Sequence, residues 1–182
     1  MNISPSTFLK YLHATLQMML GKQSAENSFD ISEDGLWQAI FASWIISSIV
    51  SIIPIQAIGW NFFPIFLVTS LVSLLSFVLL SYYFLERLKK GALFLKFMVP
   101  YLWLSSMQMI FFASITIAST VTGILQFSLL SIPAIIWIVY WLIRISVQQL
   151  GVSRLIAFGF LAGKFIIETI LGVTAGMSFS LT

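Results

Sequence analysis

The residues with the most chemical potential in this 182-residue sequence are Lys164 and Glu168, which lie within a long apolar stretch. In a helix that starts near Arg154, a rise of about 1.5 Å per residue puts Lys164 roughly 15 Å along the axis, with Glu168 one turn further. Side chains four residues apart share one helix face and can pair. Ionisable groups at such a depth in a membrane are costly and normally face the bundle interior or a water-filled cavity. The pair predicts either a proton relay, ion relay or substrate contact, or a self-neutralising structural pair.

Two glycine motifs accompany this pair. Gly159 and Gly163 form one small-xxx-small motif, and Gly172 and Gly176 form a second. Such motifs let another helix approach closely. Because the two motifs fall on opposite faces of the helix, we expect it to be packed on both sides, as a central helix or as a bridge to a partner. Close packing within the bundle and oligomerisation both remain open.

The overall composition indicates that these residues belong to an integral membrane protein. Hydrophobic residues make up 59% of the chain and charged residues 8%, against about 25% charged in an ordinary globular domain. A soluble fold of this size cannot hide so much apolar surface. The composition excludes disorder, a collagen-like repeat and a nucleic-acid partner.

The sequence also excludes several kinds of chemistry. There is no cysteine and one histidine, His13, so disulfides, thiolate metal sites and histidine clusters are ruled out. No nucleotide-binding, serine-hydrolase or zinc-protease motif occurs. We therefore expect no enzyme, no cofactor and no metal site.

Five apolar stretches follow one another with very short connections, at 36–57, 63–85, 92–118, 124–147 and 154–177. Each exceeds the roughly 18 residues expected of a membrane-spanning helix. Short connections require antiparallel neighbours. We predict an all-α membrane domain of five spans over residues 36–182. Pro133 should kink the middle of the fourth span.

Residues 1–35 form a separate N-terminal region. Ser4 and Pro5 predict the start of a helix, and Gly21 its end. Apolar residues recur in it at helical spacing: Phe8, Leu9, Leu12, Leu16, Met19 and Leu20. Because this core is too short to span a bilayer, we expect an amphipathic helix on the membrane surface or on the cytoplasmic face of the protein. A polar linker follows, and Ser32 should cap the first span.

The basic residues predict how the bundle is oriented. Eight of the nine lie on one side: Lys10, Lys22, Arg87, Lys89, Lys90, Lys96, Arg144 and Arg154. The turns on the other side carry none. The positive-inside rule then predicts a cytoplasmic N-terminus and a C-terminus outside the cell or in the periplasm. We expect the basic turns to contact anionic lipid headgroups.

This layout resembles the Yip1-domain family, whose members have a cytoplasmic N-terminal region and five closely spaced spans. A family motif of the D-L-Y-G-P-x-W type precedes the first span, and Asp30, Gly35 and Trp37 occupy that place here, with one extra residue and without the Tyr and Pro. The short N-terminal region is more similar to bacterial members. The resemblance implies a bacterial inner (plasma) membrane protein that binds partners or organises membranes.

Two functions from different classes are compatible with these observations. The leading hypothesis is a non-enzymatic accessory subunit or membrane organiser that contacts other membrane proteins or a second copy of itself. The alternative is a small transporter or permease component that uses Lys164 and Glu168.

Overall fold

The computed structural model describes residues 5–22, 28–123 and 129–179, and within these ranges the chain forms helices and no strand. The helices are α1 (Pro5–Met19), α2 (Glu33–Ile58), α3 (Phe63–Arg87), α4 (Phe94–Thr122), α6 (Ser131–Leu150) and α7 (Arg154–Phe179). Two short 3-10 helices, η2 (Trp60–Phe62) and η3 (Gly91–Leu93), lead into α3 and α4. The predicted all-α class is confirmed.

Local sequence signals explain where these helices begin and end. The Oγ atom of Ser32 accepts a hydrogen bond of 3.1 Å from the Gly35 N–H, so Ser32 caps α2 as predicted. Glu33 and Asp34 then occupy the first turn, where the helix dipole favours acidic side chains. At the other ends, α4 and α6 stop at Gly123 and Gly151, whose positive φ angles of 67° and 55° suit glycine.

Four helices in the described part of the chain are long and apolar enough to cross a membrane. They cover Glu33–Ile53, Trp60–Arg87, Gly91–Thr122 and Ser131–Leu150. This is consistent with an integral membrane protein. The first three agree with predicted spans, whereas α7 lies in the range of the predicted fifth span but is not one of these four helices.

The predicted kink at Pro133 is not tested, because residues 124–128, which precede it in the expected span, lie outside the described part of the chain. The fourth apolar stretch was expected to run from 124 to 147, with Pro133 in its middle, but α6 begins at Ser131. Pro133 is therefore the third residue of the helix, where a backbone N–H has no partner within the helix. Proline fits this position without distorting the helix.

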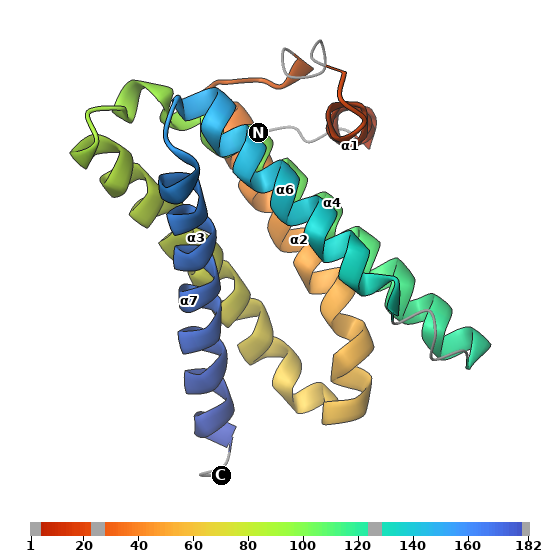
Figure 1. The fold of residues 1–182 in the computed structure, drawn as a ribbon. Coiled ribbons are helices and arrows are strands. Elements are labelled where there is room, and N and C mark those ends of the chain that lie inside the picture. The colour runs from red at the N-terminus through yellow and green to blue at the C-terminus, as the bar shows by residue number, and fades with distance from the viewer. Residues whose placement is uncertain (1–4, 23–27, 124–128, 180–182) are drawn as a thin grey trace.

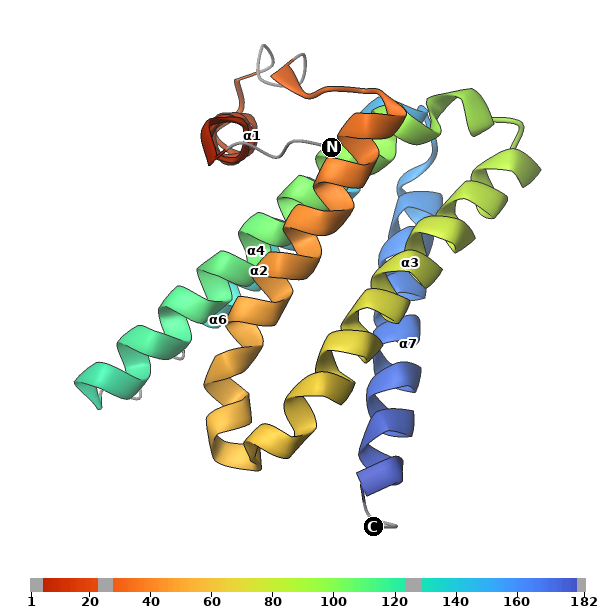
Figure 2. The ribbon, with the colours of Figure 1, turned by 180° about the vertical axis from the view of Figure 1, so that it is seen from behind.

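The long helices form two groups (Figures 1 and 2). α2, α4 and α6 run side by side, and α3 and α7 form a second pair that packs together. Contacts of α2 with α3 and of α6 with α7 join the two groups. The order α2–α3–α7–α6–α4 is therefore a closed ring of neighbours, which gives the bundle an interior.

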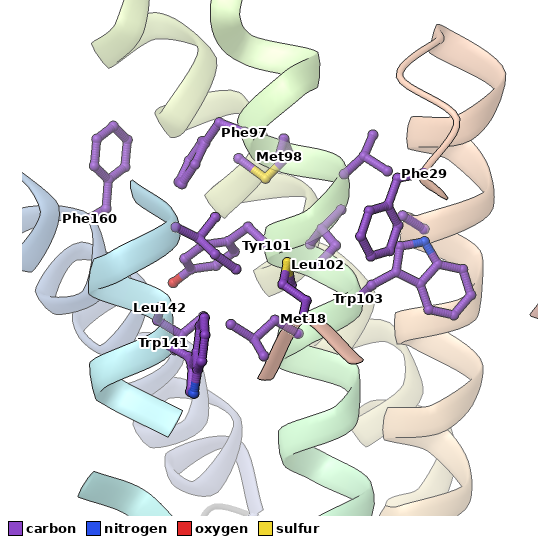
Figure 3. Packing of buried hydrophobic residues seen from close by; sticks show 14 of the residues in the cluster. Met18, Phe29, Phe97, Met98, Tyr101, Leu102, Trp103, Trp141, Leu142 and Phe160 are labelled. Carbon is purple, nitrogen blue, oxygen red and sulfur yellow. The ribbon is translucent and has the colours of Figure 1, made fainter. Parts of the chain in front are cut away.

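The core of the bundle is centred on α4. All ten residues from Phe97 to Ser106 are buried, because α1, α2, α3 and α6 each contact this helix. Figure 3 shows Tyr101 and Trp103 on opposite sides of α4, with Trp103 near Phe29 and Tyr101 toward Phe160. α4, and not the helix that carries Lys164, is thus the central helix.

α1 lies crosswise to the long helices and packs on α4 (Figure 1). Its buried face includes Tyr11, whose ring centroid is 5.2 Å from that of Trp103, together with Thr15 and Met18. Burial, aided by the negative charge of Asp30, raises the pKa of the Tyr11 phenol. Leu9 and Leu20 are exposed, although the sequence pattern grouped them with Leu12 and Leu16.

Candidate functional site

A cavity in the described structure has a volume of about 620 Å³. Residues of α2, α3, α4 and α7, together with Phe62 of η2, line it. It extends from Ser43 and Lys164, well inside their helices, to Ile55 and Phe62 near the turn between α2 and α3. Ligand pockets in proteins typically enclose about 300–1,000 Å³, so this cavity has the size of a small-molecule site.

Lys164 and Glu168 both line this cavity. The Lys164 Nζ atom lies 3.8 Å from Oε1 of Glu168, and the two side chains are 14% and 48% exposed. Lys164 also donates a hydrogen bond to the Ser105 hydroxyl of α4 and lies 5.9 Å from the centroid of the Tyr101 ring. The lysine side chain thus reaches from α7 across to the central helix.

Tyr101 contributes a polar atom that has no partner. Its side chain is 1% exposed and lines the cavity, yet its hydroxyl makes no hydrogen bond with any described residue. Aromatic contacts hold the ring in place, with centroids 5.3 Å from Phe77 and 5.1 Å from Phe97. Buried polar atoms are rarely left unsatisfied, so an unpartnered hydroxyl in a residue that lines the cavity is unusual.

Hydroxyl groups make up most of the remaining polar lining, and some of them are already engaged. The Ser43 hydroxyl lies 2.7 Å from that of Ser106 and joins α2 to α4. Ser70 donates to the Leu67 carbonyl oxygen at 3.0 Å within α3. The lining also contains Ser47, Thr69 and Ser73. Apart from Lys164 and Glu168, none of the described residues of the lining carries a charge.

The sequence identified the charged pair but not its partners on α4. Tyr101 and Ser105 are four residues apart, as are Lys164 and Glu168, so each helix presents two polar groups on one face. This spacing can be found in the sequence, but it does not stand out because tyrosine and serine occur throughout these apolar helices. Only the packing decides which of them face α7.

The glycine motifs have different environments. A Cβ atom added at Gly159 would meet nothing within 4 Å, and one at Gly163 would lie 4.0 Å from a methyl group of Leu80 on α3. The expected close packing of another helix against Gly159 therefore does not occur within the described bundle. Gly172 and Gly176 belong to α7, but their surroundings lie outside the described part of the chain.

The predicted headgroup residues fall into two groups. Lys90 donates hydrogen bonds to the carbonyl oxygens of Leu150 and, at 3.1 Å, Gly151. It therefore caps the C-terminal end of α6, where the helix dipole favours a cation. Lys89, Lys96, Arg87 and Arg154 are exposed, and Arg144 stacks over Trp141 at 4.6 Å from the ring centroid.

The three residues that resemble the Yip1 motif lie in different surroundings: Asp30 and Gly35 contact each other, and Trp37 is exposed. The backbone of Asp30 lies directly against Gly35, where a Cβ atom would be 2.8 Å from the Asp30 carbonyl carbon. Trp37 is exposed, and its ring centroid lies 6.2 Å from that of Phe41.

Comparisons of the chain with protein-family models, with curated proteins and with solved structures find no match.

Proposed function

We propose that this chain is a small transporter or permease component whose substrate site is the cavity around Lys164 and Glu168. The observation that carries the proposal is the position of two opposite charges on the wall of a cavity of about 620 Å³. Intramembrane charges that face a cavity are typical of substrate and ion pathways. The unpartnered hydroxyl of Tyr101 adds a third polar group at the same place.

We further propose a topology of five spans, with α7 as the fifth, a cytoplasmic N-terminus and a C-terminus outside. The contact of Lys90 with Gly151 supports it, because it brings the basic α3–α4 and α6–α7 connections to the same end of the bundle. The cavity then extends from mid-membrane toward the outer turn near Phe62. Leu85 and Phe97, which are both fully buried, lie near the connection between α3 and α4, at the end of the bundle that we propose to be cytoplasmic. The bacterial inner membrane remains the proposed location, and α1 is proposed to lie at its cytoplasmic surface.

Transport can be tested without knowing the substrate. Proteoliposomes would be incubated in bacterial metabolite extract and washed, and their contents measured by mass spectrometry. We expect at least one solute to accumulate relative to empty vesicles, and Lys164→Met or Glu168→Gln to reduce its uptake at least about tenfold, because each change removes a charge that contacts the substrate.

Matched controls for the uptake assay are Lys96→Met and Glu86→Gln, which change the same residue types outside the cavity. Both should accumulate the solute as the unmodified protein does. Transport by this site is contradicted if no solute accumulates, or if the cavity variants and the controls take it up equally.

The open surface at Gly159 favours a second function, that of an accessory subunit or membrane organiser like the Yip1-domain proteins. Gly159, the open end of a small-xxx-small motif, offers close approach to a helix of another chain. The resemblance of Asp30, Gly35 and Trp37 to the family motif supports the same role.

Under this second function, Gly159→Leu should reduce recovery of a co-purifying membrane protein or second copy about tenfold, because the added side chain blocks helix approach. The bundle itself should fold, since the site is open. Val68→Leu, on an exposed part of α3, is the control. Native mass spectrometry of protein extracted in mild detergent measures how much partner is recovered with each of the two variants. Equal recovery of the partner with the two variants would count against the accessory role.

A further inference from the structure

We propose that the cavity binds a zwitterion with an apolar side chain, an aromatic α-amino acid, with its carboxylate at Lys164 and its ammonium group at Glu168. This inference rests on the proposed substrate site and names the class of ligand that the site selects. Four observations support it: the charges, their separation, the free donors around them and the apolar remainder of the wall.

The charges of the cavity wall are balanced. One cation and one anion lie side by side, and the other lining residues are uncharged. A ligand with a single charge would be attracted by one member of the pair and repelled by the other. In a site of low dielectric constant such a mismatch is costly. A zwitterion matches both members and adds no net charge to the cavity.

The separation of the pair leaves room for such a ligand. The distance of 3.8 Å between Lys164 Nζ and Glu168 Oε1 exceeds the 2.7–3.2 Å of a hydrogen bond. At this distance the ion pair is loose, and the Lys164 ammonium group, which has three N–H donors, also donates to Ser105. In an α-amino acid the carboxylate and ammonium groups are both attached to the same carbon. The carboxylate can therefore contact Lys164 while the ammonium group contacts Glu168, so that each charge of the ligand lies beside the opposite charge of the protein.

The groups near Lys164 are suited to a carboxylate. Tyr101 has a buried hydroxyl without a partner, and its ring lies under the Lys164 ammonium group. Ser105, which accepts from Lys164, keeps its own O–H as a donor. Lys164 of α7 and the hydroxyl-bearing residues Tyr101 and Ser105 of α4 thus line the same end of the cavity. Charge-assisted hydrogen bonds of this kind are stronger than neutral ones.

The rest of the wall is suited to an aromatic side chain. Most of it is apolar, and it includes the aromatic residues Trp44, Phe62, Phe66 and Phe77. Aromatic rings favour edge-to-face and offset contacts with one another. A volume of about 620 Å³ leaves ample space for a single aromatic amino acid. A lipid acyl chain could fill the apolar part but would leave the two charges and the Tyr101 hydroxyl unmatched.

Three probes of the same skeleton test the charge requirement. Phenylalanine is the zwitterion, 3-phenylpropionate lacks its ammonium group, and phenethylamine lacks its carboxylate. Binding to the full-length protein in detergent would be measured by equilibrium dialysis with labelled probes. We expect phenylalanine to bind about 100-fold more tightly than either analogue, because each analogue leaves one charge of the pair unmatched.

The variants predict a reversal of preference. Lys164→Met should bind phenethylamine more tightly than phenylalanine, and Glu168→Gln should prefer 3-phenylpropionate, because one charge remains in each. Lys96→Met and Glu86→Gln should retain the preference for phenylalanine. Tyr101→Phe removes only a hydroxyl that has no partner in the protein. It should fold normally and weaken phenylalanine about tenfold while leaving phenethylamine unchanged.

Several results would overturn the inference: no binding of phenylalanine, equal binding of all three probes, or tighter binding of a singly charged probe by the unmodified protein. Recovery of a tightly held lipid that phenylalanine fails to displace would also overturn it. Phenylalanine binding without uptake of any solute leaves the inference standing and contradicts transport. Uptake of another solute without phenylalanine binding would overturn the inference and leave transport standing.

Discussion

Glu168→Leu alone is expected to destabilise the bundle by about 3 kcal/mol, whereas the double variant Lys164→Met plus Glu168→Leu should lie within about 1 kcal/mol of the unmodified protein. The single change leaves the Lys164 ammonium group, 14% exposed, without its counter-ion. The double change replaces both charges with apolar side chains of similar size. Unfolding in a detergent series, followed by circular dichroism, measures the two differences in unfolding free energy.

The same double variant separates a structural pair from a functional one. If the pair only fixes helix packing, the double variant should retain solute uptake and phenylalanine binding. We expect it to lose both while remaining folded. Glu86→Leu, at an exposed acid outside the cavity, is the control and should change the unfolding free energy little. A double variant less stable than Glu168→Leu would show that the two charges do not compensate each other.

Gly35→Ala should cost about 2–3 kcal/mol and detach the segment that links α1 to α2. The added Cβ atom would overlap the carbonyl oxygen of Asp30 and lie 3.1 Å from the Asp30 Cβ atom. Because the obstacle is backbone, it cannot move like the end of a flexible side chain. The segment would have to shift, together with Phe29, which stacks on Tyr11 at 5.9 Å between ring centroids.

The matched control for this change is Gly159→Ala, at a helix position with nothing within 4 Å. It should be neutral or slightly stabilising, because alanine favours a helix over glycine by about 1 kcal/mol. Limited proteolysis at the linker and thermal unfolding of both variants measure the difference. Equal behaviour of Gly35→Ala and Gly159→Ala would show that the contact between Asp30 and Gly35 does not hold the linker in place.

Features that depend on nearby residues were predictable from the sequence. The Ser32 cap, the acids in the first turn of α2 and the end of α1 before Gly21 are all set by side chains within one turn of the position concerned. The apolar stretches were predictable for a similar reason, because hydropathy sums over consecutive residues. The i,i+4 pairing of Lys164 with Glu168 also follows from helix geometry.

Features that depend on which helix faces meet were not predictable. Helices that are apolar on all sides give no periodic signal for the buried face. The central position of α4 and the open surface at Gly159 therefore came only from the packing. The start of α6 at Ser131 was not predictable either, because the sequence is apolar on both sides of it and hydropathy does not mark where a helix begins.

The sequence by itself thus determined an all-α membrane chain, its apolar segments and an i,i+4 lysine–glutamate pair within one of them, since each is a property of one segment. Only the tertiary structure decided what that pair faces. It brought Tyr101 and Ser105 of α4 to Lys164 of α7, residues about 60 positions apart, around one cavity. Such contacts depend on how several apolar helices pack together, and no single segment of the sequence specifies that arrangement.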